Sequence, residues 1–302
     1  MAVDPVGLSR LLALIGPVTA PGGQRVTADN VVDLTERTAY ARYADPVARK
    51  RFLIAIAGAV SRALSRAPAD SLRVLPVLAG LAGERRIQVW SRRGDEERRL
   101  SAAPLAGVLA PEPGPYAGLV VNNSAGGKLD YYLGRSLDYT LGPCRGGTRA
   151  STVTFRLTND VPPEPLPSYV TGRLDSPGRP PVAGSNLSWV SLYAGVGARL
   201  RAARLDGKPV RMITETERSH PVYSLLLEFA PRQTRTVRLD LMEPASSRPP
   251  LTPCSRSAGR SGRRSPTTPG TVPRRARPCP ARPGVERVNP RVPRPRRPGV
   301  AV

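Results

Sequence analysis

The sequence predicts an α+β protein in which a mostly helical α/β region is followed by an antiparallel β-sandwich and a disordered Arg/Pro-rich tail. Three observations lead to this prediction. Apolar residues recur at helical spacing early in the chain and alternate with polar residues later. From residue 248 onward the sequence contains no Phe, Trp, Tyr, Ile or Met. We expect the helical α/β region at 1–110, a Pro/Gly linker with a β-hairpin at 111–149, the β-sandwich at 150–245 and the tail at 246–302.

Two helices are expected in the first 43 residues. The first is indicated by apolar residues at helical spacing, namely Val6, Leu8, Leu11, Leu12 and Ile15. Gly16-Pro17 ends it, and Asp4 stands where a signal peptide carries positive charge, so we expect an amphipathic helix rather than a leader. The second helix is expected at 27–43, with Thr27 or Asp29 as its N-cap.

Asp45-Pro46 predicts the start of a third helix, because Asp is a strong N-cap and Pro suits the first helical position. Its buried stripe is expected to consist of Phe52, Ile56, Val60 and Leu64. A fourth helix is expected at about 69–83, kinked at Pro76. Residues 86–91 alternate between polar and apolar side chains and predict a strand.

Alternation dominates the second half of the chain. From residue 129 the apolar residues take odd positions and the polar residues even ones, which is typical of a half-buried antiparallel strand. The same pattern returns at 153–157, 223–229 and 237–241, and Asp206-Gly207 predicts a hairpin turn. Several short strands separated by turns are typical of a β-sandwich.

The formal net charge is +23, and all but three of the 46 basic residues are arginines. Residues 248–302 alone hold 14 Arg and one acidic residue, Glu286. Such a segment cannot bury enough apolar surface to offset the entropy of ordering it, so it is expected to be disordered. Two interpretations stay open: a basic arm for nucleic acid or an anionic surface, or a GC-rich gene read out of frame.

One His and three Cys exclude a zinc-finger array, a His-based metal site and a disulfide scaffold. No apolar run reaches the roughly 18 residues of a membrane-spanning helix. His220 is expected to be a surface turn residue, and Glu215 and Glu217 are expected to face solvent. No cofactor, metal ligand or catalytic residue is assigned, and the sequence favours a protein without enzymatic activity.

Three blocks of the sequence resemble the bacterial domain-of-unknown-function 4012 family (DUF4012), which is found chiefly in high-GC Gram-positive bacteria. They are DPVGLSRLLALIGPV at 4–18, ERRIQVWS at 84–91 and NNSAGGKLDYYL at 122–133, and PSYVTG at 167–172 and LDGKPV at 205–210 also fit. Members of this family typically begin with a membrane-anchoring helix and a further α/β segment. The resemblance therefore implies a fragment, truncated at its N-terminus and without a signal or transmembrane segment of its own. Its full-length parent would be tethered to the cell membrane on the extracytoplasmic face.

A more distant likeness is to the LytR-CpsA-Psr phosphotransferases. Those enzymes attach polymers from lipid pyrophosphate carriers to the cell wall, and they use arginines around the pyrophosphate. Arg42 matches one such position, and Asp45 with Arg49 is similar to the helix start that follows it. Tyr43 or Ala44 stands where a paired arginine belongs. The likeness implies, as an alternative, a degenerate relative of these enzymes.

The candidate anion-binding residues are Arg42, Arg49, Lys50 and Arg51. Cations in the first turns of a helix oppose its dipole, whereas a helix start with spare N–H groups favours an anion. A phosphate or anionic polymer bound by these cations would explain their position. The alternative is a solvated charged face that tertiary packing tolerates.

The candidate polar-loop residues are Asn122, Asn123, Lys128 and Asp130. The loop resembles a Gly-rich phosphate loop but lacks its glycine spacing and its Lys-Ser/Thr pair. Its place between two strands favours a structural role, in which an Asn caps the turn and Lys128 pairs with an acid across the hairpin.

These observations favour a non-catalytic cell-envelope protein whose arginine-rich helical region interacts with anionic envelope polymers or lipid headgroups. The first alternative is the degenerate phosphotransferase. The second is nucleic-acid binding through the basic tail, which predicts salt-sensitive binding of DNA without a specific sequence.

Overall fold

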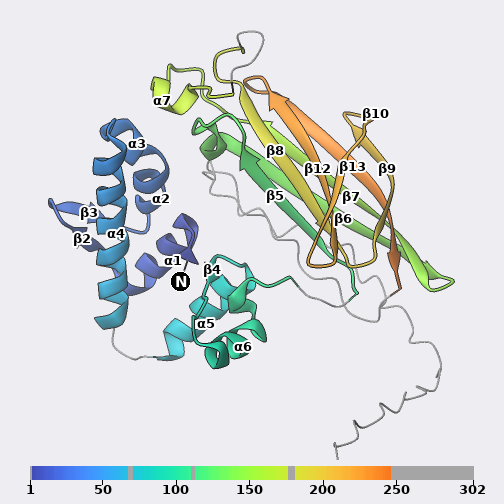
Figure 1. The fold of residues 1–302 in the computed structure, drawn as a ribbon. Helices are drawn as coiled ribbons and strands as arrows, with labels where there is room; N and C mark the ends of the chain where they lie inside the picture. Colours follow the sequence, from blue (N-terminus) through green and yellow to red (C-terminus); the bar gives the residue numbers. More distant parts are fainter. Residues whose placement is uncertain (1, 67–70, 110–112, 176–180, 246–302) are drawn as a thin grey trace, which may run out of the picture.

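The computed structural model describes residues 2–66, 71–109, 113–175 and 181–245 of the 302-residue chain. Figure 1 shows the helices gathered on one side of the molecule and the long strands on the other. The predicted α+β fold class is confirmed, because a helical region precedes two antiparallel sheets that pack together. The predicted tail at 246–302 lies outside the described residues.

The helical region contains helices and two small antiparallel sheets. The helices are α1 (Pro5–Ile15), α2 (Val31–Asp33), the π-helix η1 (Leu34–Thr38), α3 (Ala39–Arg42), α4 (Pro46–Arg66), α5 (Ser71–Gly83), α6 (Gly94–Ser101) and the 3-10 helix η2 (Pro104–Ala106). The sheets pair β1 (Ala2–Val3) with β4 (Ile87–Gln88), and β2 (Val18–Ala20) with β3 (Gln24–Val26).

The predicted start of the third helix is confirmed, and the first helix also begins at an aspartate N-cap. The Asp4 carboxylate accepts a hydrogen bond from the Gly7 N–H at 2.6 Å, and α1 begins at the next residue, Pro5. The Asp45 carboxylate accepts from the N–H groups of Val47 and Ala48, at 3.1 and 2.9 Å, at the start of α4. In both cases a side-chain oxygen satisfies N–H groups that the helix itself leaves free.

Two helical-region predictions differ from the structure in detail. The helix expected at 27–43 begins only at Val31, and its middle five residues, Leu34–Thr38, are π-helical. The strand expected at 86–91 is reduced to Ile87–Gln88, because its partner β1 offers only two residues for pairing. The fourth helix is confirmed as α5, which contains Pro76.

The sandwich consists of a four-stranded and a five-stranded antiparallel sheet. The first has the order β11 (Ile213–Glu217), β12 (His220–Phe229), β8 (Asn186–Ala194) and β5 (Ala117–Asn123). The second has the order β10 (Lys208–Pro209), β9 (Arg199–Leu205), β13 (Thr234–Pro244), β7 (Thr148–Asn159) and β6 (Leu133–Arg145). The 3-10 helix η3 (Leu129–Tyr132) and the short helix α7 (Ser168–Thr171) lie in the connections.

The core between the sheets follows the alternation of the sequence. Odd-numbered residues of β7 and β13, such as Phe155 and Leu239, are buried against Leu192 and Phe229 of the other sheet. Burial of one such side chain contributes about 1.5–3 kcal/mol. The alternation at 153–157, 223–229 and 237–241 therefore corresponds to strands β7, β12 and β13.

The sandwich also uses strands from the segment that the sequence assigns to a linker and hairpin. β5 and β6 both come from 111–149, and each joins a different sheet. The strand expected from residue 129 begins at Leu133, because Leu129–Tyr132 form η3. His220 is not a surface residue: its side chain is buried against the Tyr116 ring, and its Nδ1 lies 2.7 Å from the Ala194 carbonyl oxygen.

Candidate functional site

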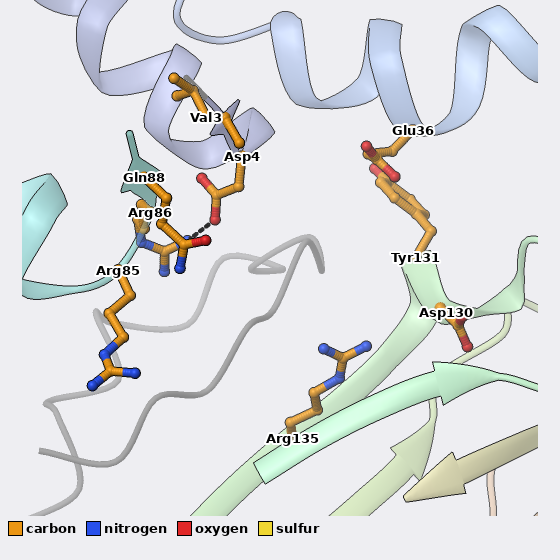
Figure 2. A pocket seen from close by; sticks show the side chains of 10 residues that line it. Val3, Asp4, Glu36, Arg85, Arg86, Gln88, Asp130, Tyr131 and Arg135 are labelled. Carbon is orange, nitrogen blue, oxygen red and sulfur yellow. Dashed lines mark hydrogen bonds and ion pairs between the residues drawn. The ribbon is translucent and has the colours of Figure 1, made fainter. Parts of the chain in front are cut away.

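A pocket of about 340 Å³ lies where the helical region meets the first strands of the sandwich. In Figure 2, residues of the helical region, such as Asp4 and Arg86, and residues of the sandwich region, such as Tyr131 and Arg135, lie around the pocket. The helical region supplies Ala2, Val3, Asp4, Glu36, Arg85, Arg86 and Gln88. The sandwich region supplies Asp130, Tyr131 and Arg135. Its walls combine apolar surface with several charged groups, a combination that is typical of a site for a small molecule.

An ion pair closes one side of the pocket. A carboxylate oxygen of Asp4 lies 2.7 Å from a guanidinium nitrogen of Arg86, so the residue that caps α1 also holds the strand β4 region in place. Arg86 forms a second ion pair, at 2.8 Å, with Glu84. Two carboxylates therefore form ion pairs with Arg86, and these fix the position of its guanidinium group.

Glu36 enters the pocket from the π-helix η1 and is half-buried. It forms no hydrogen bond or ion pair within the part of the chain that the structure describes. Burial raises the pKa of its carboxyl above the ordinary value; the nearby Lys128 opposes this rise and Asp4 adds to it. π-helical turns inside helices occur frequently at functional sites, since they change the direction in which a side chain points.

Arg85 enters the pocket from the turn after α5. Its backbone is left-handed, with φ of 55°, a conformation uncommon for residues other than glycine. Its guanidinium lies 5.9 Å from the centre of the Tyr116 ring, and it has no carboxylate partner among the described residues. This left-handed residue ends α5 in a Schellman motif, in which the N–H groups of Arg85 and Arg86 donate to the carbonyls of Ala82 and Leu81, at 2.9 and 2.8 Å.

The sandwich side of the pocket carries both signs of charge. Asp130 accepts a hydrogen bond from the Asn186 side-chain amide at 3.0 Å. The Tyr131 hydroxyl donates to the Asp33 carboxylate of α2, which ties the two regions together. Burial lowers the pKa of the Arg135 guanidinium, and the Asp130 carboxylate opposes that change.

A cluster of cations and aromatic rings lies on the same junction. Arg49 is buried and donates to the Tyr43 carbonyl at 3.1 Å and to the Tyr169 hydroxyl at 2.8 Å. Its Cζ lies 4.9 Å from the Tyr40 ring centre and 4.4 Å from that of Tyr169. The Lys128 ammonium lies 4.9 Å from the Tyr40 ring centre. Such contacts are favourable because the face of an aromatic ring is electron-rich.

The four predicted anion-binding residues separate into two groups. Arg49 is held in the aromatic cluster, whereas Arg42, Lys50 and Arg51 are exposed. Arg42 donates to the Gln24 side-chain carbonyl at 3.1 Å and lies 5.8 Å from the Phe52 ring centre, beside α4. The N-terminal N–H groups of α4 are taken by Asp45, so an anion at this surface would be held by side chains.

The four predicted loop residues also separate. Asn123 closes the turn by accepting from the N–H groups of Ala125 and Gly126, at 2.9 and 2.6 Å, and Asn122 is exposed. Lys128 contacts the Tyr40 ring, and Asp130 lines the pocket. The structure thus brings Lys128 and Arg49 to the same Tyr40 ring and leaves both Asn residues out of the pocket lining.

Sequence reasoning missed Glu36, Arg85, Arg86, Tyr131 and Arg135 as a group. One signal was available: the three blocks at 4–18, 84–91 and 122–133 meet at this pocket and supply six of its lining residues. Those residues are Asp4, Arg85, Arg86, Gln88, Asp130 and Tyr131.

Within the described ranges, no group of three or more His, Cys, Asp or Glu side chains is placed to hold a metal ion. In the same ranges, no helix combines the length and the apolar character needed to cross a membrane.

The fold and the pocket define a two-part protein with a helical region, a β-sandwich and a charged pocket at their junction. The model of the DUF4012 family, described as a protein of unknown function, matches residues 1–40, which include Asp4 and Glu36. This match supports the DUF4012 assignment. The likeness to the LytR-CpsA-Psr enzymes and the high-GC Gram-positive origin stay predictions.

A comparison with curated proteins finds no match. Among solved structures, a candidate nutrient-binding protein from Legionella pneumophila is similar with a TM-score of 0.26 and 7% sequence identity. The similarity covers 43% of this chain and 44% of that protein, so the chain spans less than half of it. At this level, the similarity says nothing about the function of the chain.

Proposed function

We propose that this protein is a non-catalytic component of the cell envelope that binds anionic envelope polymers through the exposed face of α4. The observation that carries the proposal is the charge of this helix, in which every charged residue is a cation: Arg49, Lys50, Arg51, Arg62 and Arg66. All of them except Arg49 are exposed, and none of the exposed four is ion-paired within the described ranges. Arg42 adds a further exposed cation beside the helix.

A polyanion suits this surface better than a small anion does. Each exposed cation contributes little by itself, because water and salt screen its field. A row of cations without acids creates a positive potential over one face, which attracts a chain of repeated negative charges. Lipid headgroups at the membrane surface present the same chemistry in two dimensions.

The proposed location is the extracytoplasmic face of the cell membrane, with the parent protein tethered there. What supports this location is the resemblance to the DUF4012 family, together with the family match over residues 1–40.

The test compares two triple variants of the full chain that carry the same net charge. One is Lys50→Gln/Arg51→Gln/Arg62→Gln on α4, and the other is Arg199→Gln/Arg201→Gln/Arg211→Gln, three exposed residues of the sandwich region. Binding of fluorescent poly(glycerol phosphate) is measured by anisotropy over a range of salt concentrations. We expect the α4 variant to bind at least about tenfold more weakly and with a smaller salt dependence, while the control resembles the unmodified chain.

Because both variants keep the residues from 248 onward, any contribution of that segment cancels in the comparison. Equal affinities of the two variants would contradict the proposal. Binding that disappears only when residues 248–302 are deleted would favour the tail as the polyanion-binding segment instead.

A further inference from the structure

The side of α4 that faces water has an uncharged line along its centre. Val47, Ile54 and Ser61 follow one another at intervals of seven residues, two turns of the helix, and Ser65 continues the same line. The line lies opposite Ile56, which is buried. Val47 is 56% exposed and Ile54 is 60% exposed, although a surface helix usually places charged or polar residues on the side that faces water.

The polar groups on this uncharged line require little from the solvent. The Ser65 hydroxyl donates a hydrogen bond to the Ser61 carbonyl at 3.0 Å, so it is already satisfied within the helix. Val47 and Ile54 belong to none of the apolar clusters that form the core of the helical region. The centre of this face would therefore gain free energy on leaving water, because most of what it presents is apolar.

Cations lie on both sides of the uncharged line. At 3.6 residues per turn, Lys50 lies on one side of it and Arg51 and Arg62 lie on the other, and all three are exposed. Asp45 stands at the start of the helix, where its carboxylate accepts hydrogen bonds from backbone N–H groups. Lys and Arg side chains keep their charged ends in a polar layer while their carbon chains lie along apolar groups, which is how such residues behave at a membrane surface.

We propose that α4 lies flat on a membrane surface that contains anionic lipids. Val47 and Ile54 enter between the headgroups, and Lys50, Arg51 and Arg62 contact the lipid phosphates on either side. This inference rests on the proposed binding of polyanions by α4, and it names the polyanion that the helix meets. A dissolved polymer offers negative charge alone, whereas a lipid surface offers negative charge and an apolar layer directly beneath it.

The first test compares two ligands, vesicles of phosphatidylglycerol and phosphatidylcholine and fluorescent poly(glycerol phosphate), with variants of the full chain. We expect Val47→Gln/Ile54→Gln to weaken vesicle binding at least about tenfold and to change polymer binding by less than about twofold. Val47→Leu/Ile54→Leu should bind vesicles like the unmodified chain, since it keeps both side chains apolar. Ile213→Gln/Leu226→Gln, at two sandwich residues that are each 49% exposed, is the matched control and should change neither affinity.

Two outcomes of this comparison would overturn the inference. Unchanged vesicle binding of Val47→Gln/Ile54→Gln would show that these side chains do not enter the lipid layer. An equal loss for vesicles and polymer would show that they support the helix rather than contact lipid. Circular dichroism of each variant confirms the fold.

The second test detects insertion at α4 itself. Ile54→Trp is made in the chain that also carries Trp90→Phe and Trp189→Phe, so that its fluorescence comes from α4 alone. We expect the emission maximum to move to shorter wavelength with anionic vesicles and to stay unchanged with the polymer, because only the vesicles remove the indole from water. Ile213→Trp in the same background is the control and should not respond. An unchanged emission maximum of Ile54→Trp with vesicles would overturn the inference, and binding through residues from 248 onward does not mimic the expected shift.

The cation variant Lys50→Gln/Arg51→Gln/Arg62→Gln separates this inference from the proposed function. If it loses affinity for the polymer while Val47→Gln/Ile54→Gln binds vesicles normally, α4 binds polyanions in solution and only the membrane inference fails. If it binds both ligands like the unmodified chain, the proposed function fails and the inference fails with it. Loss of affinity for both ligands in the cation variant, and for vesicles alone in Val47→Gln/Ile54→Gln, supports both.

Discussion

Glu243 places a carboxyl group in the interior of the sandwich. Its side chain is 2% exposed, and both carboxylate oxygens lie 2.7 Å from the Tyr139 hydroxyl, which donates to them. Burial raises the pKa of Glu243 above its ordinary value of 4.5; the hydrogen bond from Tyr139 and the charge of Arg149 oppose that rise. Because the folded state holds its proton more tightly than the unfolded state does, Glu243 favours folding most at low pH.

We therefore predict that the contribution of Glu243 to the free energy of unfolding is largest below pH 4.5. This contribution is lost as the pH rises through the higher pKa that Glu243 has in the folded state. In Glu243→Gln, a neutral side chain of similar size keeps an acceptor for Tyr139, so the free energy of unfolding falls less with rising pH than in the unmodified chain. Urea unfolding at a series of pH values measures the difference. Glu215→Gln, on the exposed strand β11, is the control, and parallel profiles for all three proteins would show that Glu243 does not titrate as described.

Individual residues differ in how well the sequence predicts whether they are buried. Glu243 continues the inward series of Val237, Leu239 and Leu241 at odd positions, so alternation alone predicts its burial. Arg49 is different. Its spacing from Phe52 and Ile56 places it on the buried face of α4, but its position beside Lys50 and Arg51 suggests an exposed run of cations. The tertiary structure supplies its distant partner, Tyr169.

The β9–β10 hairpin shows how one turn fixes an element in a sheet. Asp206 and Gly207 both have positive φ, 50° and 81°, as the Asp-Gly sequence predicts for a two-residue hairpin turn. The Asp206 carboxylate then accepts from the Thr236 N–H at 2.8 Å and from the Arg235 guanidinium at 2.7 Å. The turn residue therefore also attaches the hairpin to β13.

We predict that Asp206→Ala lowers the free energy of unfolding by about 1–3 kcal/mol, because it removes both hydrogen bonds and because Ala tolerates positive φ less well than Asp does. Asp206→Asn should cost less, since Asn tolerates this conformation and keeps one acceptor oxygen. Equilibrium denaturation measures both variants. If Asp206→Asn lowered the free energy of unfolding as much as Asp206→Ala does, neither the backbone conformation of residue 206 nor its acceptor oxygen would contribute to stability.

The helical region and the sandwich are joined through a few polar and aromatic contacts. Arg49 and Lys128 link the two parts through the rings of Tyr169 and Tyr40, and Tyr131 donates to Asp33. Around the pocket, these contacts take the place of a continuous apolar core. We infer that they make the two regions unfold together.

The two tryptophans allow this to be measured, because Trp90 lies in the helical region and Trp189 in β8 of the sandwich. In the single-tryptophan variants Trp90→Phe and Trp189→Phe, we predict the same denaturation midpoint by fluorescence. Addition of Tyr169→Ala and Tyr131→Phe should lower the midpoint reported by Trp90 well below that reported by Trp189. Two midpoints that stay equal after these changes would show that other contacts couple the regions.

The sequence by itself determined the fold class, the end of α1, the start of α4 and the inward faces of β7, β12 and β13. Each of these depends on residues near one another in the chain, through capping, fixed backbone angles or alternation. Only the tertiary structure decided that β5 and β6 join different sheets, and that Asp4, Glu36, Arg85 and Asp130 surround one pocket. Those arrangements depend on contacts between distant segments, and periodicity specifies which face of a strand or helix is buried without specifying what lies against it.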